Sequence, residues 1–207
     1  MNNFRALPII LTIVFFSASC ATLHYKKEIK EHRIAYREDF QNSDHAPLKG
    51  SQLNDMAFYP ADDKYVVKAK VISNESPENY DVETSSGMKK SFYTYGHAEF
   101  TLDDIIIKLE LIRNLKVIQM PQYKDYLFLA FTDLTNGEDT YGGGRYIDLY
   151  ISDIEEGHIT IDFNKAYNPY CAYSDGYNCP IPPASNYINL EIKAGEKMYK
   201  GPYLVKH

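Results

Sequence analysis

The sequence predicts a mainly β fold, an antiparallel β-sandwich or barrel with an N-terminal helix. From Phe58 onward, apolar and polar residues alternate with the period of two that is typical of half-buried strands. Turn-forming pairs such as Asn136-Gly137 and Glu156-Gly157 separate these short segments. Many short strands with such spacing favour an antiparallel architecture over alternating strands and helices.

The size and charge of the chain indicate one soluble domain, which we place at residues 46–207. The chain has 207 residues, of which 44% are hydrophobic and 24% charged. This length is sufficient for one hydrophobic core but is short for two. Its formal net charge is −6, so it lacks the basic excess that binds a phosphate backbone. We therefore expect no nucleic-acid partner.

The N-terminus predicts export and lipid anchoring. Residues 1–19 resemble a signal peptide, with one positive charge at Arg5 followed by an apolar run from Ala6 to Phe16. Small residues then precede Cys20, as in the lipobox of bacterial lipoproteins, although Ser17 replaces the usual Leu. This resemblance implies a lipidated Cys20 in the cell envelope, and Ala21 in place of Asp favours the outer membrane. An uncleaved anchor from Ala6 to Leu23 is the alternative.

The segment that follows the anchor is predicted to be a leading helix. Within residues 20–45, the stretch from Leu23 to Gln41 is highly charged, but apolar residues recur near helical spacing. This narrow stripe, which would dock on the domain, comprises Tyr25, Ile29, Tyr36 and Phe40. Residues 42–55 are polar and contain Pro47 and Gly50, which predicts a connecting loop.

Ten segments are predicted to be strands. In 105–111 the odd positions are apolar and share one face, and residues 187–193 repeat this pattern. Residues 127–131 are apolar throughout, which predicts a central strand covered on both faces. The full set is 65–72, 80–84, 91–95, 99–102, 105–111, 115–120, 127–131, 146–151, 159–163 and 187–193.

Cys171 and Cys179 remain once Cys20 is lipidated, and they are predicted to form a disulfide. They are close in sequence and belong to a compartment where disulfides persist. The alternative is a metal site, but two cysteines with no histidine nearby offer too few ligands for zinc. We therefore expect neither a metal nor a cofactor.

A glycine-rich segment, residues 134–148, is the first unusual feature. Gly142, Gly143 and Gly144 precede Arg145 and Tyr146. Three glycines cost conformational entropy, which indicates that the backbone needs a positive φ or approaches another group very closely. That group is either a ligand or absent, in which case the glycines form a flexible hairpin tip. The segment lacks the Lys and Ser or Thr of a phosphate-binding loop.

The second unusual feature is residues 162–183, rich in Asp, Asn and Tyr and without a regular period. It is either an ordered loop stapled by the cysteines or the wall of a pocket. A hairpin from Tyr146 to Phe163 would place Arg145 and Asp162 at the same end of the sheet. The two unusual segments are therefore expected to converge on one polar site.

Four segments resemble those of a known family: residues 84–87, 131–148 around the glycines, 162–183 and 194–197. Through them the chain resembles domain-of-unknown-function family 1684, which has bacterial and archaeal members. The resemblance extends from about Ile34 to the C-terminus. It implies no particular activity.

These observations favour a lipid-anchored protein that binds a small polar ligand, sugar-like or carboxylated. The alternatives are a hydrolase of an envelope metabolite, with Asp133 or Asp162 as base beside Arg145, and a structural lipoprotein without a pocket. His97 is more typical of a structural histidine than of a catalytic one. The candidate ligand-binding residues are Gly142, Gly143, Gly144, Arg145, Tyr146, Asp133, Asp162, Asn164, Tyr167 and Tyr173.

Lipidation at Cys20 can be tested by metabolic labelling with a fatty-acid probe. The wild type and a variant lacking both Cys171 and Cys179 should be labelled, whereas Cys20→Ala should not, because it removes the acceptor thiol. Equal labelling of Cys20→Ala and the wild type would contradict the prediction.

Overall fold

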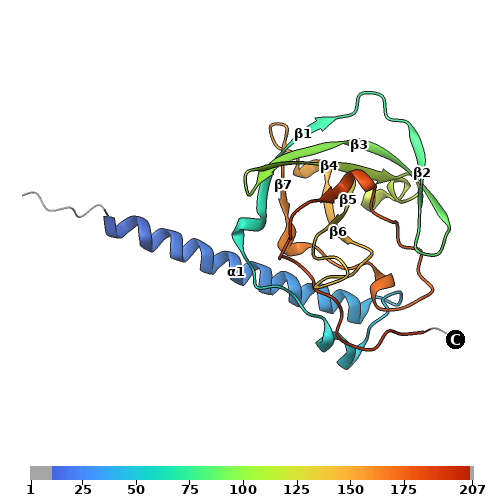
Figure 1. Cartoon of the computed structure of the whole chain (residues 1–207), viewed down its shortest axis with the longest axis horizontal. Coiled ribbons are helices and arrows are strands. Elements are labelled where there is room, and N and C mark those ends of the chain that lie inside the picture. Colours follow the sequence, from blue (N-terminus) through green and yellow to red (C-terminus); the bar gives the residue numbers. More distant parts are fainter. Residues whose placement is uncertain (1–10, 206–207) are drawn as a thin grey trace, which may run out of the picture.

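A long helix packs beside a curled β-sheet in the computed structural model, which describes residues 11–205 and the side chains of residues 22–205 (Figure 1). The helix, α1, spans Leu11–Asn42. The first ten residues of the predicted signal peptide, and the side chain of Cys20, lie outside what the structure describes. Within the described part, no helix is long and apolar enough to cross a membrane.

The sheet contains eight strands within residues 11–205 and curls into a half-barrel. Its main path runs in the order β6-β5-β4-β3-β1-β7, with β2 paired to β3 and β8 paired to β5. All pairings are antiparallel except that of β5 with β8. The predicted mainly β fold with an N-terminal helix is therefore confirmed. The strands are β1 Val66–Ser73, β2 Asn79–Glu83, β3 Lys89–Leu102, β4 Ile105–Asn114, β5 Tyr126–Asp133, β6 Arg145–Tyr150, β7 His158–Asp162 and β8 Tyr187–Ile188.

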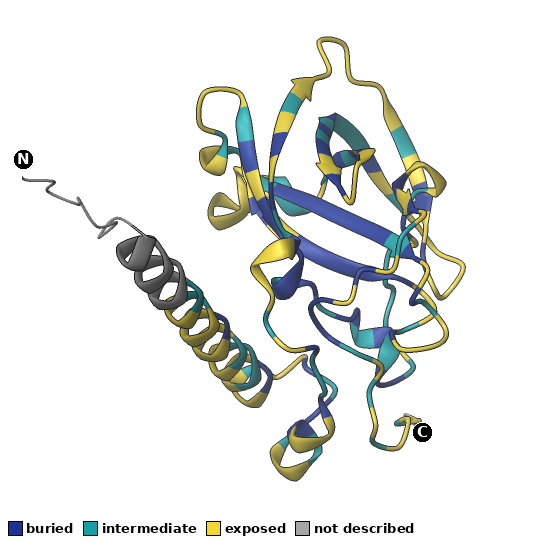
Figure 2. Cartoon of the chain, turned by 60° about the vertical axis from the view of Figure 1, so that its left-hand side comes forward, coloured by how far each residue is buried: buried dark blue, intermediate teal, exposed yellow. Residues whose placement is uncertain are grey.

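The centre of the sheet is covered on both faces, as predicted for residues 127–131 (Figure 2). On β5, Leu127, Leu129 and Phe131 are fully buried in the main core of the half-barrel. Phe128 and Ala130 point to the opposite face and belong to a smaller apolar cluster with residues of β2, β3, β4 and β6. This alternation follows from the period of two along a strand.

The helix α1 docks through the predicted apolar stripe. Ile29 is fully buried and Phe40 is almost so. The Phe40 ring meets the rings of Tyr170 and Tyr173 edge to face, with centroids 5.3 and 5.6 Å apart. This edge-to-face geometry is the favoured one for aromatic pairs. The helix is thereby fixed against residues 170–173, which lie far from it in sequence.

Several predicted strands have different bounds. The segments 91–95 and 99–102 belong to one long strand, β3, with a register shift against β4 between Thr94 and Gly96. Residues 115–120 are not a strand, because the Asn114 side chain accepts hydrogen bonds from the backbone N–H groups of Lys116 and Val117, both at 3.0 Å. These bonds turn the chain into a short 3-10 helix, Val117–Gln119.

The last predicted strand, 187–193, is only two residues long in the structure. β8 comprises Tyr187 and Ile188, although Ile188 and Ile192 are buried as the alternating pattern predicted. The strand ends because later carbonyls in this segment bond elsewhere. Leu190 accepts from the backbone N–H of Leu134, and Ile192 accepts from the Arg145 guanidinium.

The hairpin predicted from Tyr146 to Phe163 is wrong. β6 pairs with β5 and β7 pairs with β1, so the two strands stand at opposite ends of the sheet path. A hydrogen bond from the Tyr150 backbone N–H to the Asp153 carboxylate, 2.9 Å long, starts a 3-10 turn and ends β6 before a hairpin can form.

Arg145 is fully buried and ties three parts of the chain together. Its Nη2 donates to Asp133 Oδ2 at 2.7 Å and to the Ile192 carbonyl at 2.9 Å, and its Nη1 donates to the Ala194 carbonyl. The guanidinium also lies over the Phe131 ring, 5.3 Å from its centroid. The expected pair of Arg145 with Asp162 is therefore wrong, because Asp133 takes that place.

The glycine beside Arg145 is required by the fold itself. Gly144 has a φ of +84°, and a Cβ there would lie 2.6 Å from the Phe131 carbonyl oxygen and 2.7 Å from Pro182 Cγ. Only glycine combines this φ with so close an approach. The close approach predicted from the glycine run is therefore made by the chain's own backbone.

Arg145→Ala should lower the free energy of unfolding by about 3 to 5 kcal/mol, because it leaves the Asp133 carboxylate buried without a partner. Urea unfolding followed by circular dichroism measures this loss. The double variant Arg145→Met/Asp133→Leu should be less destabilised than Arg145→Met alone, since no unpaired charge remains. A loss below about 1 kcal/mol for Arg145→Ala would contradict this role.

Candidate ligand-binding site

A cavity of about 1270 Å³ lies between α1 and the sheet. One face of the helix lines it with Tyr25, His32 and Tyr36, and the start of β5 and the middle of β6 line the opposite side. Residues 176–180, next to the disulfide, form a further wall. The volume is sufficient for a drug-sized or sugar-sized molecule.

Tyrosines dominate this cavity: eight of the nineteen in the chain line it. Five of these rings, together with that of Phe128, form a continuous belt in which each centroid is 4.7 to 6.3 Å from the next. Such rings offer apolar faces for stacking and hydroxyls for hydrogen bonding. In order, the belt comprises Tyr123, Tyr126, Phe128, Tyr146, Tyr167 and Tyr36.

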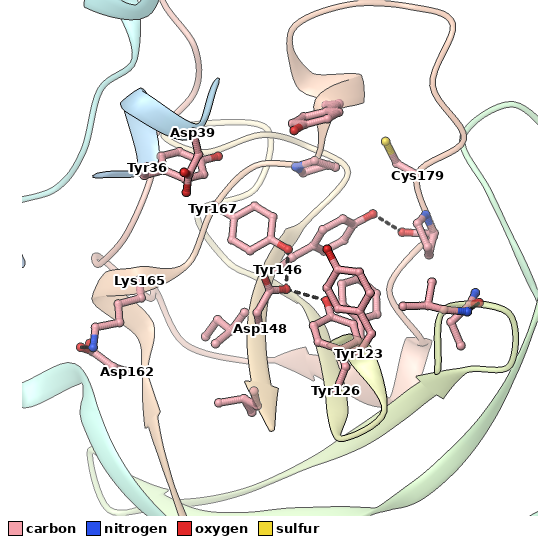
Figure 3. Close-up of a pocket in the computed structure, with 18 of the residues that line it drawn as sticks. Tyr36, Asp39, Tyr123, Tyr126, Tyr146, Asp148, Asp162, Lys165, Tyr167 and Cys179 are labelled. Carbon is pink, nitrogen blue, oxygen red and sulfur yellow. Dashed lines mark hydrogen bonds and ion pairs between the residues drawn. The ribbon is translucent and has the colours of Figure 1, made fainter. Parts of the chain in front are cut away.

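Asp148 lies at the centre of this belt (Figure 3). It projects from β6, directly across from Phe128 on β5. The hydroxyls of Tyr126 and Tyr167 both donate to its Oδ1, each at 2.6 Å. Within the described residues it makes no ion pair, and Oδ2 has no hydrogen-bond partner. One carboxylate oxygen is thus held in place and the other is available.

The two tyrosines that hold Asp148 remain protonated. Burial, reinforced by the negative charge of Asp148, raises the pKa of both Tyr126 and Tyr167 well above the ordinary value. Their hydroxyls therefore act as donors to the carboxylate at any physiological pH. The arrangement fixes the orientation of Asp148.

The remaining charges make the cavity acidic. Five carboxylates line it, against two lysines. Lys165 is already paired, at 3.1 Å from Glu28 and 3.8 Å from Asp162, and Lys90 donates to the Asn178 carbonyl. Burial and the charge of Lys165 lower the pKa of His32, so it adds no positive charge near neutral pH. The lining therefore favours groups that donate hydrogen bonds or carry positive charge.

Three of the predicted site residues, Tyr146, Asp162 and Tyr167, line this cavity. Tyr146 Oη donates to the Pro180 carbonyl at 2.5 Å, and Asp162 Oδ1 accepts from Tyr25 Oη at 2.9 Å. Asn164 and Tyr173 lie behind the cavity wall and are almost fully buried. The 162–183 segment thus contributes both lining and supporting residues.

The other predicted residues do not line the cavity: Gly142, Gly143, Gly144, Arg145 and Asp133. Arg145 and Asp133 bind one another in the core, so Arg145 cannot hold a ligand carboxylate. Asp133 cannot act as a general base either, because Oδ1 accepts from Thr135 and Oδ2 from Arg145. The three glycines and Arg145 therefore do not join the site as we expected, although Tyr146 of the same segment pairs with Tyr167 and lines the cavity beside it.

Sequence reasoning missed Asp148 and the tyrosines of β5 and α1. Asp148 alternates with Ile147 and Leu149, which are buried in the main core, so it has the pattern of an ordinary solvent-facing residue. Two tyrosines could have indicated the site from the sequence. Tyr146 on β6 and Tyr126 on the neighbouring strand β5 both lie on the same face of the sheet as Asp148.

The predicted disulfide is confirmed: Cys171 and Cys179 are bonded, with Cα atoms 6.3 Å apart. It closes the loop that carries Tyr177 and Asn178 to the cavity. Closing a loop this short raises the free energy of unfolding by about 2 to 3 kcal/mol through the entropy of the unfolded chain. This is enough to hold the irregular cavity wall in place.

A buried carboxylate, Glu196, supports the cavity from behind. It is fully buried and accepts hydrogen bonds from Tyr173 Oη at 2.6 Å, the Asn168 backbone N–H at 2.9 Å and Tyr36 Oη at 3.3 Å. Burial raises the pKa of Glu196 to about 7, although these hydrogen bonds oppose the change. Tyr36 of the cavity is thus bonded to a group that titrates near neutral pH.

These features place the chain among β-rich proteins whose curled sheet and covering helix enclose a ligand-sized cavity. The chain belongs to the family described as protein of unknown function (DUF1684), which matches residues 51–197. The resemblance predicted from the sequence is therefore confirmed.

A solved structure shares this fold. It is the solution NMR structure of an uncharacterized protein from Haloarcula marismortui, which is 32% identical with a TM-score of 0.65. The match covers 86% of this chain and 96% of that chain. No curated protein sequence matches the chain.

Stability should fall as pH rises from about 4.5 to about 7, the ordinary and the raised pKa of Glu196. In this window the folded protein holds a proton that the unfolded chain has released, so rising pH favours unfolding. Each pH unit contributes up to about 1.4 kcal/mol, which gives a total decrease of about 3 kcal/mol.

Glu196→Gln should flatten this dependence, whereas Glu191→Gln, at an exposed pair with Lys193, should retain it. Urea unfolding at several pH values measures the effect. An unchanged slope in Glu196→Gln would exclude Glu196 as its source.

Proposed function

We propose that this protein binds a small polar ligand in the tyrosine-lined cavity, with Asp148 as the residue that anchors it. The observation that carries the proposal is a carboxylate fixed by two phenol hydroxyls with its second oxygen unpaired. A fixed carboxylate with a free acceptor matches a hydroxyl or amino group, because these donate hydrogen bonds.

The belt of rings supports the same ligand class. Apolar rings surrounding a few positioned polar groups are typical of small-molecule sites, and tyrosine faces suit the apolar face of a sugar ring or an ammonium group. The acidic lining favours a hydroxylated or amine-bearing compound over a carboxylated one. We therefore narrow the expected ligand to a sugar-like or amino-sugar-like molecule.

We propose further that binding takes place at the cell envelope, with a lipidated Cys20 holding the protein on the outer membrane. The small residues before Cys20 support this location. The predicted anchor leads into α1, whose residues 25–39 form one wall of the cavity. The lipid anchor and one wall of the cavity would then lie on the same helix, α1.

The proposal can be tested by calorimetric titration of the full chain, in a non-ionic detergent, with glucose, glucosamine and glucuronic acid. Glucosamine and glucose should bind more tightly than glucuronic acid, because the cavity is acidic. Asp148→Asn should weaken binding by about tenfold, since it removes a charge-assisted hydrogen bond. Ala35→Trp, on the cavity face of α1, should block binding by filling the space.

The matched control is Asp44→Asn, which removes an exposed carboxylate outside the cavity and should bind as the wild type does. Thermal melts should show each variant folded. Equal affinity of Asp148→Asn and the wild type, or no binding of any compound, would contradict the proposal.

A further inference from the structure

A second groove, of about 550 Å³, lies on the other flank of α1. The helix positions that line it differ from those that line the tyrosine cavity, with the buried Ile29 between the two sets. The opposite side of the groove is made by residues 56–61. The cations that line it are Lys26, Lys30, Arg33 and Arg37.

Among the described residues, no acid lines this basic groove, and Asp162 acts on Arg33 only from outside it. None of the four cations of the groove makes an ion pair within the described part of the chain. The whole chain carries a net charge of −6, so a cluster of four cations is opposite in sign to the net charge of the protein. Like charges held this close repel one another unless an anion lies between them.

Arg33 provides the strongest evidence for a missing partner. Its Nε and Nη2 are buried and have no hydrogen-bond partner among the described residues. Buried donors nearly always have a partner, and an unsatisfied guanidinium is especially costly. Burial lowers the pKa of Arg33, and the charge of Arg37 adds to this, while Tyr25 and Asp162 oppose the change without cancelling it.

The geometry holds the two arginines side by side. Both guanidiniums lie over the Phe58 ring, at 4.8 Å for Arg33 and 5.1 Å for Arg37. Arg37 is fixed by hydrogen bonds to the carbonyls of Leu53 and Met56, at 3.3 and 3.2 Å. Two adjacent guanidiniums with free N–H groups are the arrangement that binds phosphate oxygens.

The rest of the groove is apolar. Ile34, which is 46% exposed, Met56, Phe58, Pro60 and Ala61 complete its lining. A free inorganic anion gains nothing from such a surface, whereas an amphiphile buries part of its chain on it. We propose that the basic groove binds the phosphate group of an anionic phospholipid.

The test is calorimetric titration of the full chain, in a non-ionic detergent, with three ligands: dihexanoyl phosphatidylglycerol, dihexanoyl phosphatidylcholine and inorganic phosphate. The anionic lipid should bind at least about tenfold more tightly than the zwitterionic one, and raised salt should weaken it. Free phosphate should bind more weakly than the anionic lipid. Equal affinity for the two lipids would overturn the proposal, and equal affinity for phosphate and the anionic lipid would overturn the lipid assignment.

Variants locate the site. Arg33→Gln should weaken binding of the anionic lipid at least about tenfold. Lys27→Gln is the matched control: it removes one charge from the same helix, but Lys27 pairs with Glu31 outside the groove. Exposed Lys30→Gln serves as a second variant should Arg33→Gln not fold. Wild-type affinity in both groove variants would overturn the proposal. Asp148→Asn, which tests the tyrosine cavity, should leave lipid binding unchanged.

Discussion

The buried pair of Arg145 and Asp133 is the constraint on which the rest of the structure depends. It joins the start of β6 to the end of β5, and through backbone carbonyls it holds the C-terminal segment at residues 192–194. One unpaired charge in this core would cost several kcal/mol, so the three parts of the chain must assemble together. Arg145 lies across from Phe131 in the same register that places Asp148 across from Phe128.

The sequence predicted the elements whose signals are local. Ile29 and Phe40 at helical spacing identified α1, and the apolar run at 127–131 identified the central strand. The predictions from sequence were wrong where a residue distant in sequence determines the pairing of a strand or a side chain. Arg145 was expected to meet Asp162 through a hairpin, but β7 pairs with β1, and no local pattern in β6 or β7 records that choice.

The candidate site was only partly predictable for the same reason. The sequence singled out Gly144 as a candidate ligand contact. In the structure its close neighbours are the Phe131 carbonyl and Pro182, so this glycine is required by packing and not by a ligand. Asp148 is an exposed residue on β6, as its place in the alternating pattern predicts. Its environment is created by Tyr167 and Tyr36, which arrive from a loop and a helix remote in sequence. Tertiary contacts, which the sequence pattern does not encode locally, make this ordinary carboxylate the centre of the candidate site.

The position of α1 has a thermodynamic consequence. The helix supplies one wall of the tyrosine cavity and most of the basic groove, so both spaces exist only while it is docked. A molecule held on either flank raises the docked population and thereby the affinity of the other flank, and linkage makes the effect reciprocal. Two chemically unlike ligands would then cooperate through a single rigid element without touching one another.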